Sequence, residues 1–88
     1  MSTIPVEIIS PERIEYSVEC EFVVLPCTDG EVGIMPGHTN LIAQLNKGIV
    51  TFHSPSHGNS VYDISAGFAL VSPKSVKVYT TYAQKRLN

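Results

Sequence analysis

The 88-residue chain contains no tryptophan, two cysteines and no long apolar run. A helix that spans a membrane needs about 20 consecutive apolar residues, and no stretch approaches that length. Small disulfide-stabilised secreted domains usually carry more cysteines than Cys20 and Cys27, and we find no signal peptide before them. We therefore expect free thiols in a reducing compartment, in a domain that reaches a membrane only through other proteins.

Charge is sparse and slightly acidic. Eight acidic and six basic residues give a formal net charge of −2. Proteins that bind nucleic acids carry a basic patch that neutralises phosphates, and here the lysines and arginines are dispersed apart from Lys85-Arg86. The sequence thus predicts no nucleic-acid partner. The densest acidic cluster, which we interpret as a solvated outer face, comprises Glu12, Glu15, Glu19 and Glu21.

The sequence also lacks a sustained 3.6-residue apolar period, so it gives no sign of a long amphipathic helix. Short β-branched or alternating segments recur instead, with turn signals every eight to twelve residues. These features predict an all-β fold, a flattened sandwich or barrel of about ten short, mostly antiparallel strands. The expected strands are 4–9, 13–17, 19–26, 31–35, 49–53, 60–65, 67–72 and 75–81. Residues 40–45 fit either a helix or a strand, and 81–88 are too short for an independent helix.

Reactive side chains form no recognisable catalytic or metal-binding pattern. Cys27 and His38 could be a thiol and a base, but no third group with suitable spacing orients them. The spacings of the cysteines with His38, His53 and His57 match no zinc motif. We therefore expect no catalytic residue, no cofactor and no metal.

Residues 25–41 concentrate turn signals, with three of the six glycines and two of the six prolines. Asp29-Gly30 and Pro36-Gly37 each fit a tight turn, and the second fits type II with glycine in third position. No helix follows either glycine to complete a phosphate site. We interpret this stretch as a rigid double turn that displays Glu31 and His38 for contact with a protein.

Within that stretch, Glu-Val-Gly-Ile-Met-Pro-Gly-His at residues 31–38 resembles the ATP synthase epsilon subunit. Further segments resemble the same family in the same order, so the resemblance covers nearly the whole chain. They are Val-Glu-Ile-Ile-Ser-Pro-Glu-Arg at 6–13, Lys-Gly-Ile-Val at 47–50, Ile-Ser-Ala-Gly-Phe-Ala-Leu-Val at 64–71 and Val-Lys-Val at 76–78.

Three turn positions depart from the family pattern. Cys27 and Ala66 stand where glycine is common, and Asn40 where proline is common. A larger departure is that the family continues into a helical hairpin, whereas this sequence reaches Asn88 about where that hairpin begins. We therefore expect residues 1–88 to be the amino-terminal β-sandwich domain without the hairpin. The inhibitory role associated with the hairpin is not carried over.

The resemblance implies a non-catalytic subunit of the F-type ATP synthase central stalk. Such a subunit docks gamma onto the polar loops of the c-ring, contacts the alpha/beta head indirectly, and couples proton-driven rotation to ATP synthesis. By resemblance, the c-ring contact would comprise Asp29, Gly30, Glu31, Val32 and Gly33. The gamma contact would comprise His38, Thr39 and Leu41.

The expected location is peripheral, at the cytoplasmic face of a bacterial cell membrane and through the complex alone. The alternative is a stand-alone β-sandwich that binds a small ligand or carbohydrate. Such sites favour exposed aromatics, whereas Tyr16, Tyr62, Tyr79 and Tyr82 mostly fall in strand alternation that indicates core or half-core packing.

Overall fold

The computed structural model describes residues 2–37 and 40–86, and every regular element among them is a β-strand. The expected all-β class is thereby confirmed. The strands are β1 (Ile4–Ile9), β2 (Ile14–Cys20), β3 (Phe22–Cys27), β4 (Gly30–Ile34), β5 (Leu41–Leu45), β6 (Gly48–Ser54), β7 (Gly58–Ile64), β8 (Gly67–Ser72), β9 (Ser75–Thr80) and β10 (Ala83–Lys85).

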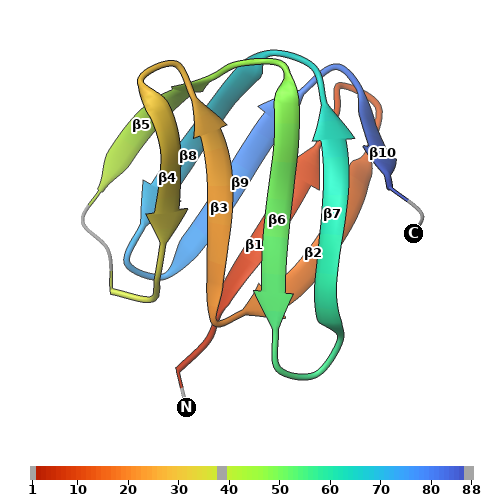
Figure 1. Cartoon of the computed structure of the whole chain (residues 1–88). Helices are drawn as coiled ribbons and strands as arrows, with labels where there is room; N and C mark the ends of the chain where they lie inside the picture. The colour runs from red at the N-terminus through yellow and green to blue at the C-terminus, as the bar shows by residue number, and fades with distance from the viewer. Residues whose placement is uncertain (1, 38–39, 87–88) are drawn as a thin grey trace.

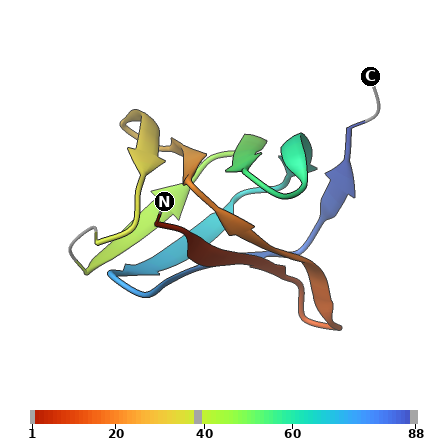
Figure 2. The ribbon, with the colours of Figure 1, turned by 90° about the horizontal axis from the view of Figure 1, so that it is seen from below.

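The strands form one continuous hydrogen-bonded path that folds over into two layers (Figures 1 and 2). Its order is β10-β7-β6-β3-β5-β8-β9-β1-β2, with β4 paired to β3 beside the path. β3 joins the layers because residues 22–24 pair with β6, whereas Cys27 pairs with Leu45 of β5. All pairs are antiparallel except β1 with β9, where Val6 lies opposite Val76.

The core lies between the layers and follows from the alternation of side chains along the strands. In β6, Val50, Phe52 and Ser54 point inward, while the intervening residues are partly exposed. The two free sides of the sandwich approach each other at an aromatic cluster. Tyr16 of β2 stacks on Tyr62 at 4.6 Å and meets the edge of Phe52 at 5.1 Å between ring centroids. These rings hold the nearly closed sandwich together where β2 has no strand partner on that side.

Two sequence-based boundaries need correction. Residues 14–20 form the single strand β2 and the chain bends at Glu21, so the expected break between 13–17 and 19–26 was misplaced. Within the ambiguous segment 40–45, Leu41–Leu45 form strand β5, which pairs along its length with β8. Near the carboxyl end, β10 pairs with β7, and Arg86 donates two hydrogen bonds to the Asp63 carboxylate.

Candidate docking surfaces

The two turns of the 25–41 stretch lie at opposite ends of β4 (Figure 1). A five-residue strand is about 15 Å long, so the turns do not form one continuous surface. The β3–β4 turn lies at the same end of the sandwich as the β1–β2 and β9–β10 turns, and Pro36-Gly37 lies at the other end. The rigid double turn expected from the sequence is therefore divided between two separate ends of the sandwich.

The β3–β4 turn is held rigidly against its neighbours. Gly30 has a φ of 117°, which residues with a side chain rarely adopt. The Thr28 amide donates to the Gln44 carbonyl at 3.0 Å, and the Asn46 amide donates to the Pro26 carbonyl at 2.8 Å. These bonds tie the base of the β3–β4 hairpin to β5 and to the turn after it. The exposed tip of the hairpin is therefore held in a fixed position.

The structure brings the five residues of the expected c-ring contact together on this hairpin. Asp29, Gly30, Glu31 and Gly33 are exposed. Val32 is half-buried and packs against the core. The exposed acidic side chains are therefore those of Asp29 and Glu31, and Val32 anchors the strand that carries them.

The opposite end holds one described member of the expected gamma contact. Leu41 begins β5 and is exposed. His38 and Thr39 lie outside the described residues. The turn before them is anchored because the Gly37 amide donates to the Pro73 carbonyl at 3.3 Å, and Gly37 has a φ of 84°.

Sequence reasoning missed an exposed, mostly apolar surface on the outer side of β5, β8, β9 and β1, in which Gln44 lies opposite Phe68 and Lys77 opposite Leu70. Ile42 lies opposite Leu70, and the side chains are 75% and 38% exposed. Phe68, 44% exposed, stacks on Tyr79 at 5.0 Å between ring centroids, and Ile9 follows on the adjacent strand. We call this set the outer apolar face: Ile9, Ile42, Phe68, Leu70 and Tyr79.

A signal for this face was present in the sequence. Phe68-Ala69-Leu70-Val71 is apolar on both sides of the strand, and such a strand must be covered on both sides. Ala69 and Val71 are buried in the core, whereas Phe68 and Leu70 are left without a protein layer over them. Tyr82, expected near the core, is instead 52% exposed.

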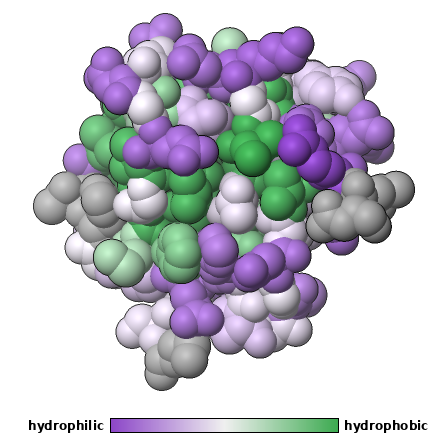
Figure 3. All heavy atoms as spheres, in the orientation of Figure 1, coloured by the Kyte–Doolittle hydropathy of each residue, from purple (hydrophilic) through white to green (hydrophobic). Residues whose placement is uncertain are grey.

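Apolar side chains also gather on the outer side of β3 and β6 (Figure 3). The residues there that alternate with the core are only partly exposed, among them Val24 of β3, Ile49 of β6 and Val61 of the adjacent β7. Phe22 stacks on His53 at 4.0 Å between ring centroids, so this histidine is held by an aromatic neighbour. The more exposed apolar side chains of the two outer surfaces therefore belong to the outer apolar face.

The two cysteines are free thiols. Cys20 is completely buried, and this burial raises the pKa of its thiol to about 11, with a smaller contribution from Glu19. Burial, followed by the charge of Asp29, also raises the pKa of Cys27. Both thiols therefore stay protonated near neutral pH, which is unfavourable for a nucleophile or a metal ligand. Residues 2–37 and 40–86 contain no group of three or more ligating side chains suited to a metal ion.

The raised pKa of Cys20 predicts a loss of stability at alkaline pH. The unfolded thiol titrates near 9.0 and the folded one near 11, so between these values the unfolded state loses its proton first. The free energy of unfolding should fall by about 1–2 kcal/mol as pH rises from 9 to 11. Urea titrations across this range should detect it. The variant Cys20→Val should lack this component, and an unchanged pH slope in the variant would assign the effect to other groups.

No helix long and apolar enough to cross a membrane occurs in the described ranges.

Comparison with known proteins finds relatives over nearly the whole chain. Residues 3–86 match the family described as ATP synthase, Delta/Epsilon chain, beta-sandwich domain. The ATP synthase epsilon chain of Bordetella avium is 39% identical over 83 residues, which are 94% of this chain and 59% of that protein. The epsilon chain of Syntrophomonas wolfei is 36% identical over 94% of this chain and 61% of that protein. The chain thus spans about three fifths of the length of these relatives.

Solved structures support the same fold at lower identity. A chain in the Euglena gracilis mitochondrial ATP synthase structure, described as OSCP/F1/c-ring, superposes with a TM-score of 0.87 at 23% identity. That match covers 97% of this chain and 54% of the other. A chain in the central stalk/c-ring structure of Tetrahymena thermophila mitochondrial ATP synthase gives 0.77 at 9% identity, covering 94% and 66%. Both chains were solved within assemblies of several subunits.

Proposed function

Since this chain belongs to the ATP synthase delta/epsilon-chain β-sandwich family, we propose that it docks the gamma subunit onto the c-ring of an F-type ATP synthase. Residues 1–88 would be the amino-terminal β-sandwich domain of an epsilon subunit. The role is non-catalytic, because the domain transmits torque between the proton-driven ring and the alpha/beta head. Its location would be peripheral, on a membrane-bound complex.

The observation that carries this proposal is the outer apolar face. A monomeric protein rarely leaves a contiguous apolar patch on one side of a sheet unless another molecule covers it. Ile42, Phe68 and Leu70 are all exposed on neighbouring strands β5 and β8. This rigid face suits a permanent protein contact, and we assign it to gamma. Leu41, at the start of β5, is paired with Val71 and alternates with Ile42, so it lies on the opposite side of the sheet from this face.

The β3–β4 hairpin is the proposed contact with the c-ring. It presents two acidic side chains, Asp29 and Glu31, on a turn that hydrogen bonds hold in place. Exposed carboxylates on a fixed turn suit polar loops, since the contact needs position and charge and no apolar burial. The separation of this hairpin tip from the outer apolar face lets the domain engage two partners at once.

One experiment with two partners tests this assignment. The tagged full chain and the purified gamma subunit and c-ring of the same organism should bind in separate measurements. Leu70→Glu should weaken binding to gamma at least tenfold, because a charge would be placed in an apolar contact. Glu31→Lys should weaken binding to the c-ring and change its salt dependence.

The control is Asn59→Glu, an exposed position on β7 that is remote from both surfaces. It should bind both partners as the unaltered chain does. Equal binding of gamma by Leu70→Glu and Asn59→Glu would contradict the gamma assignment. Unchanged affinity and salt dependence of Glu31→Lys would contradict the c-ring assignment.

A further inference from the structure

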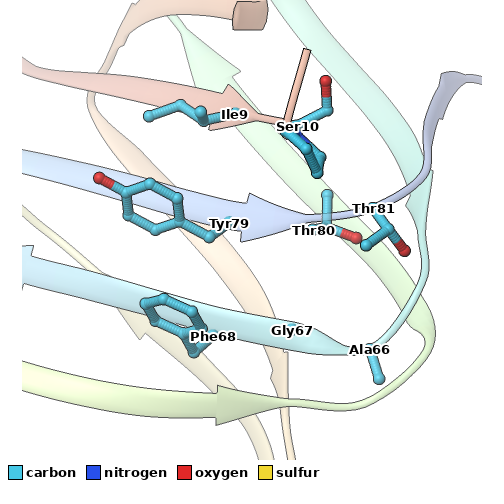
Figure 4. Close-up of a pocket in the computed structure, with 9 residues that line it drawn as sticks. Ile9, Ser10, Ala66, Gly67, Phe68, Tyr79, Thr80 and Thr81 are labelled. Atoms are coloured by element: carbon cyan, nitrogen blue, oxygen red, sulfur yellow. The ribbon is translucent and has the colours of Figure 1, made fainter. Parts of the chain in front are cut away.

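A cavity of about 430 Å³ opens at one end of the outer apolar face (Figure 4). Three members of that face form its walls: Ile9 of β1, Phe68 of β8 and Tyr79 of β9. Ala66 and Thr81 lie at its end, on the turns that precede β8 and follow β9. The cavity and the outer apolar face are therefore one continuous surface, flat over the strands and hollow at the end.

β8 and β9 approach each other closely at the wall of the cavity. Gly67 lies so near Tyr79 that a Cβ on Gly67 would be 2.0 Å from the Tyr79 carbonyl oxygen. The backbones of β8 and β9 are therefore in close contact at Gly67, and the rings of Phe68 and Tyr79 stack on each other next to it. The backbone around the cavity is held by paired strands, so the cavity cannot close by a small shift of one side chain.

The polar groups near the cavity already have partners. The Thr80 hydroxyl donates to the Ser65 carbonyl at 3.1 Å and lies 2.7 Å from the Ser65 hydroxyl. On the other side, the Ser10 hydroxyl donates to the Glu15 carboxylate at 2.8 Å. Among the described residues, no buried side-chain nitrogen or oxygen lacks a partner. A ligand would find few hydrogen bonds to make, so the cavity fits an apolar occupant.

We propose that this cavity receives one large apolar side chain of the subunit that covers the outer apolar face, and that this side chain is the main anchor of the contact. The inference rests on the proposed function, which supplies the covering subunit. Continuity favours a protein side chain over a free small molecule, because the shared walls Phe68 and Tyr79 extend the apolar surface beyond the cavity. Large side chains that fill well-packed, desolvated pockets carry much of the binding energy of a protein contact.

Filling the cavity from its rim tests the anchor without altering the strands. In Ala66→Phe the new ring would occupy the cavity, and affinity for the purified gamma subunit of the same organism should fall at least tenfold. Thr81→Trp would fill it from the turn that follows β9 and should have the same effect, which covers the case in which one variant fails to fold. Thermal unfolding of each variant identifies those that are folded.

The matched control is Asn46→Phe, which adds the same ring on an exposed turn at that end of the sandwich but outside the cavity. It should bind gamma normally. If the folded filling variants also bind gamma normally while Leu70→Glu binds it more weakly, the cavity is not the anchor of the contact. The assignment of the outer apolar face to gamma would still hold. If Leu70→Glu is unaffected as well, the proposed function fails.

Two further outcomes would overturn the anchor in favour of another occupant. A dimer of the unaltered chain in sedimentation experiments, dissociated by Ala66→Phe, would assign the cavity to a second copy. Native mass spectrometry of the purified chain would instead detect a retained small apolar molecule that both filling variants lose. A monomeric, ligand-free chain with weakened gamma binding in the filling variants supports the anchor.

Discussion

Gly67→Ala should destabilise the domain by about 4 kcal/mol and leave much of it unfolded at 37 °C. The added Cβ would lie 2.0 Å from the Tyr79 carbonyl oxygen, 3.1 Å from its carbonyl carbon and 3.3 Å from the Thr80 Cα. All three are backbone atoms of the paired strand, so no side-chain rotation relieves the clash. The strands β8 and β9 must move apart, which breaks hydrogen bonds in the middle of the sheet.

Gly33→Ala is the matched control for this prediction. Gly33 also lies within a strand, has no positive φ, and has nothing within 4 Å of an added Cβ. The alanine should therefore change stability by no more than about 1 kcal/mol, in the stabilising direction, because it restricts the unfolded chain. Chemical denaturation of both variants measures the difference. Similar stabilities would show that β8 and β9 can separate at Gly67 with little cost.

Phe52→Ala should lower the free energy of unfolding by about 3–5 kcal/mol. Phe52 is completely buried, and its ring lies 5.1 Å from that of Tyr16 and 5.7 Å from that of Tyr62, between centroids. These contacts join β2 to β6 and β7 where the sandwich closes without strand pairing. Removing the ring leaves a cavity and also takes away the surface that positions Tyr16.

The control is Phe22→Ala, which removes a ring that is half-buried and stacks on His53 at the surface. This substitution should lower the free energy of unfolding by about 1 kcal/mol, because the site opens to solvent and leaves no closed cavity. Urea denaturation followed by tyrosine fluorescence suits both variants. A cost for Phe52→Ala as small as that for Phe22→Ala would show that the closure of the sandwich does not depend on this cluster.

The fold was predictable where one face of a strand is buried and the other is not. In β6, partly exposed and buried residues alternate from Ile49 to Ser54 as the sequence pattern indicates. The pattern failed at residues 13–26, because nothing local marks the bend at Glu21 between two apolar strands. Residues 40–45 were ambiguous because their strand character comes from pairing with β8, a contact that the local sequence does not encode.

The candidate surfaces were predictable in part. Turn chemistry located the exposed tip at Asp29 to Glu31, since glycine and acidic residues indicate it directly. The outer apolar face was missed because Phe68 and Leu70 look like core residues in sequence. Which side of an apolar strand lacks a covering layer depends on how the sheets stack. The cavity beside Gly67 depends on the separation of two backbones, which no residue pattern reports.

The parallel pairing of β1 with β9 has a consequence for how the protein is made. Val6 pairs with Val76, so the first strand of the chain must wait for nearly the last one. At a translation speed of about 5–20 residues per second, this delay is on the order of 4–14 s. Throughout it, the β1–β2 hairpin has an unpaired edge that can associate with other chains. The sheet therefore cannot close around β1 until β9 has been synthesised, and β9 is the strand that links the β1–β2 hairpin to the rest of the sandwich.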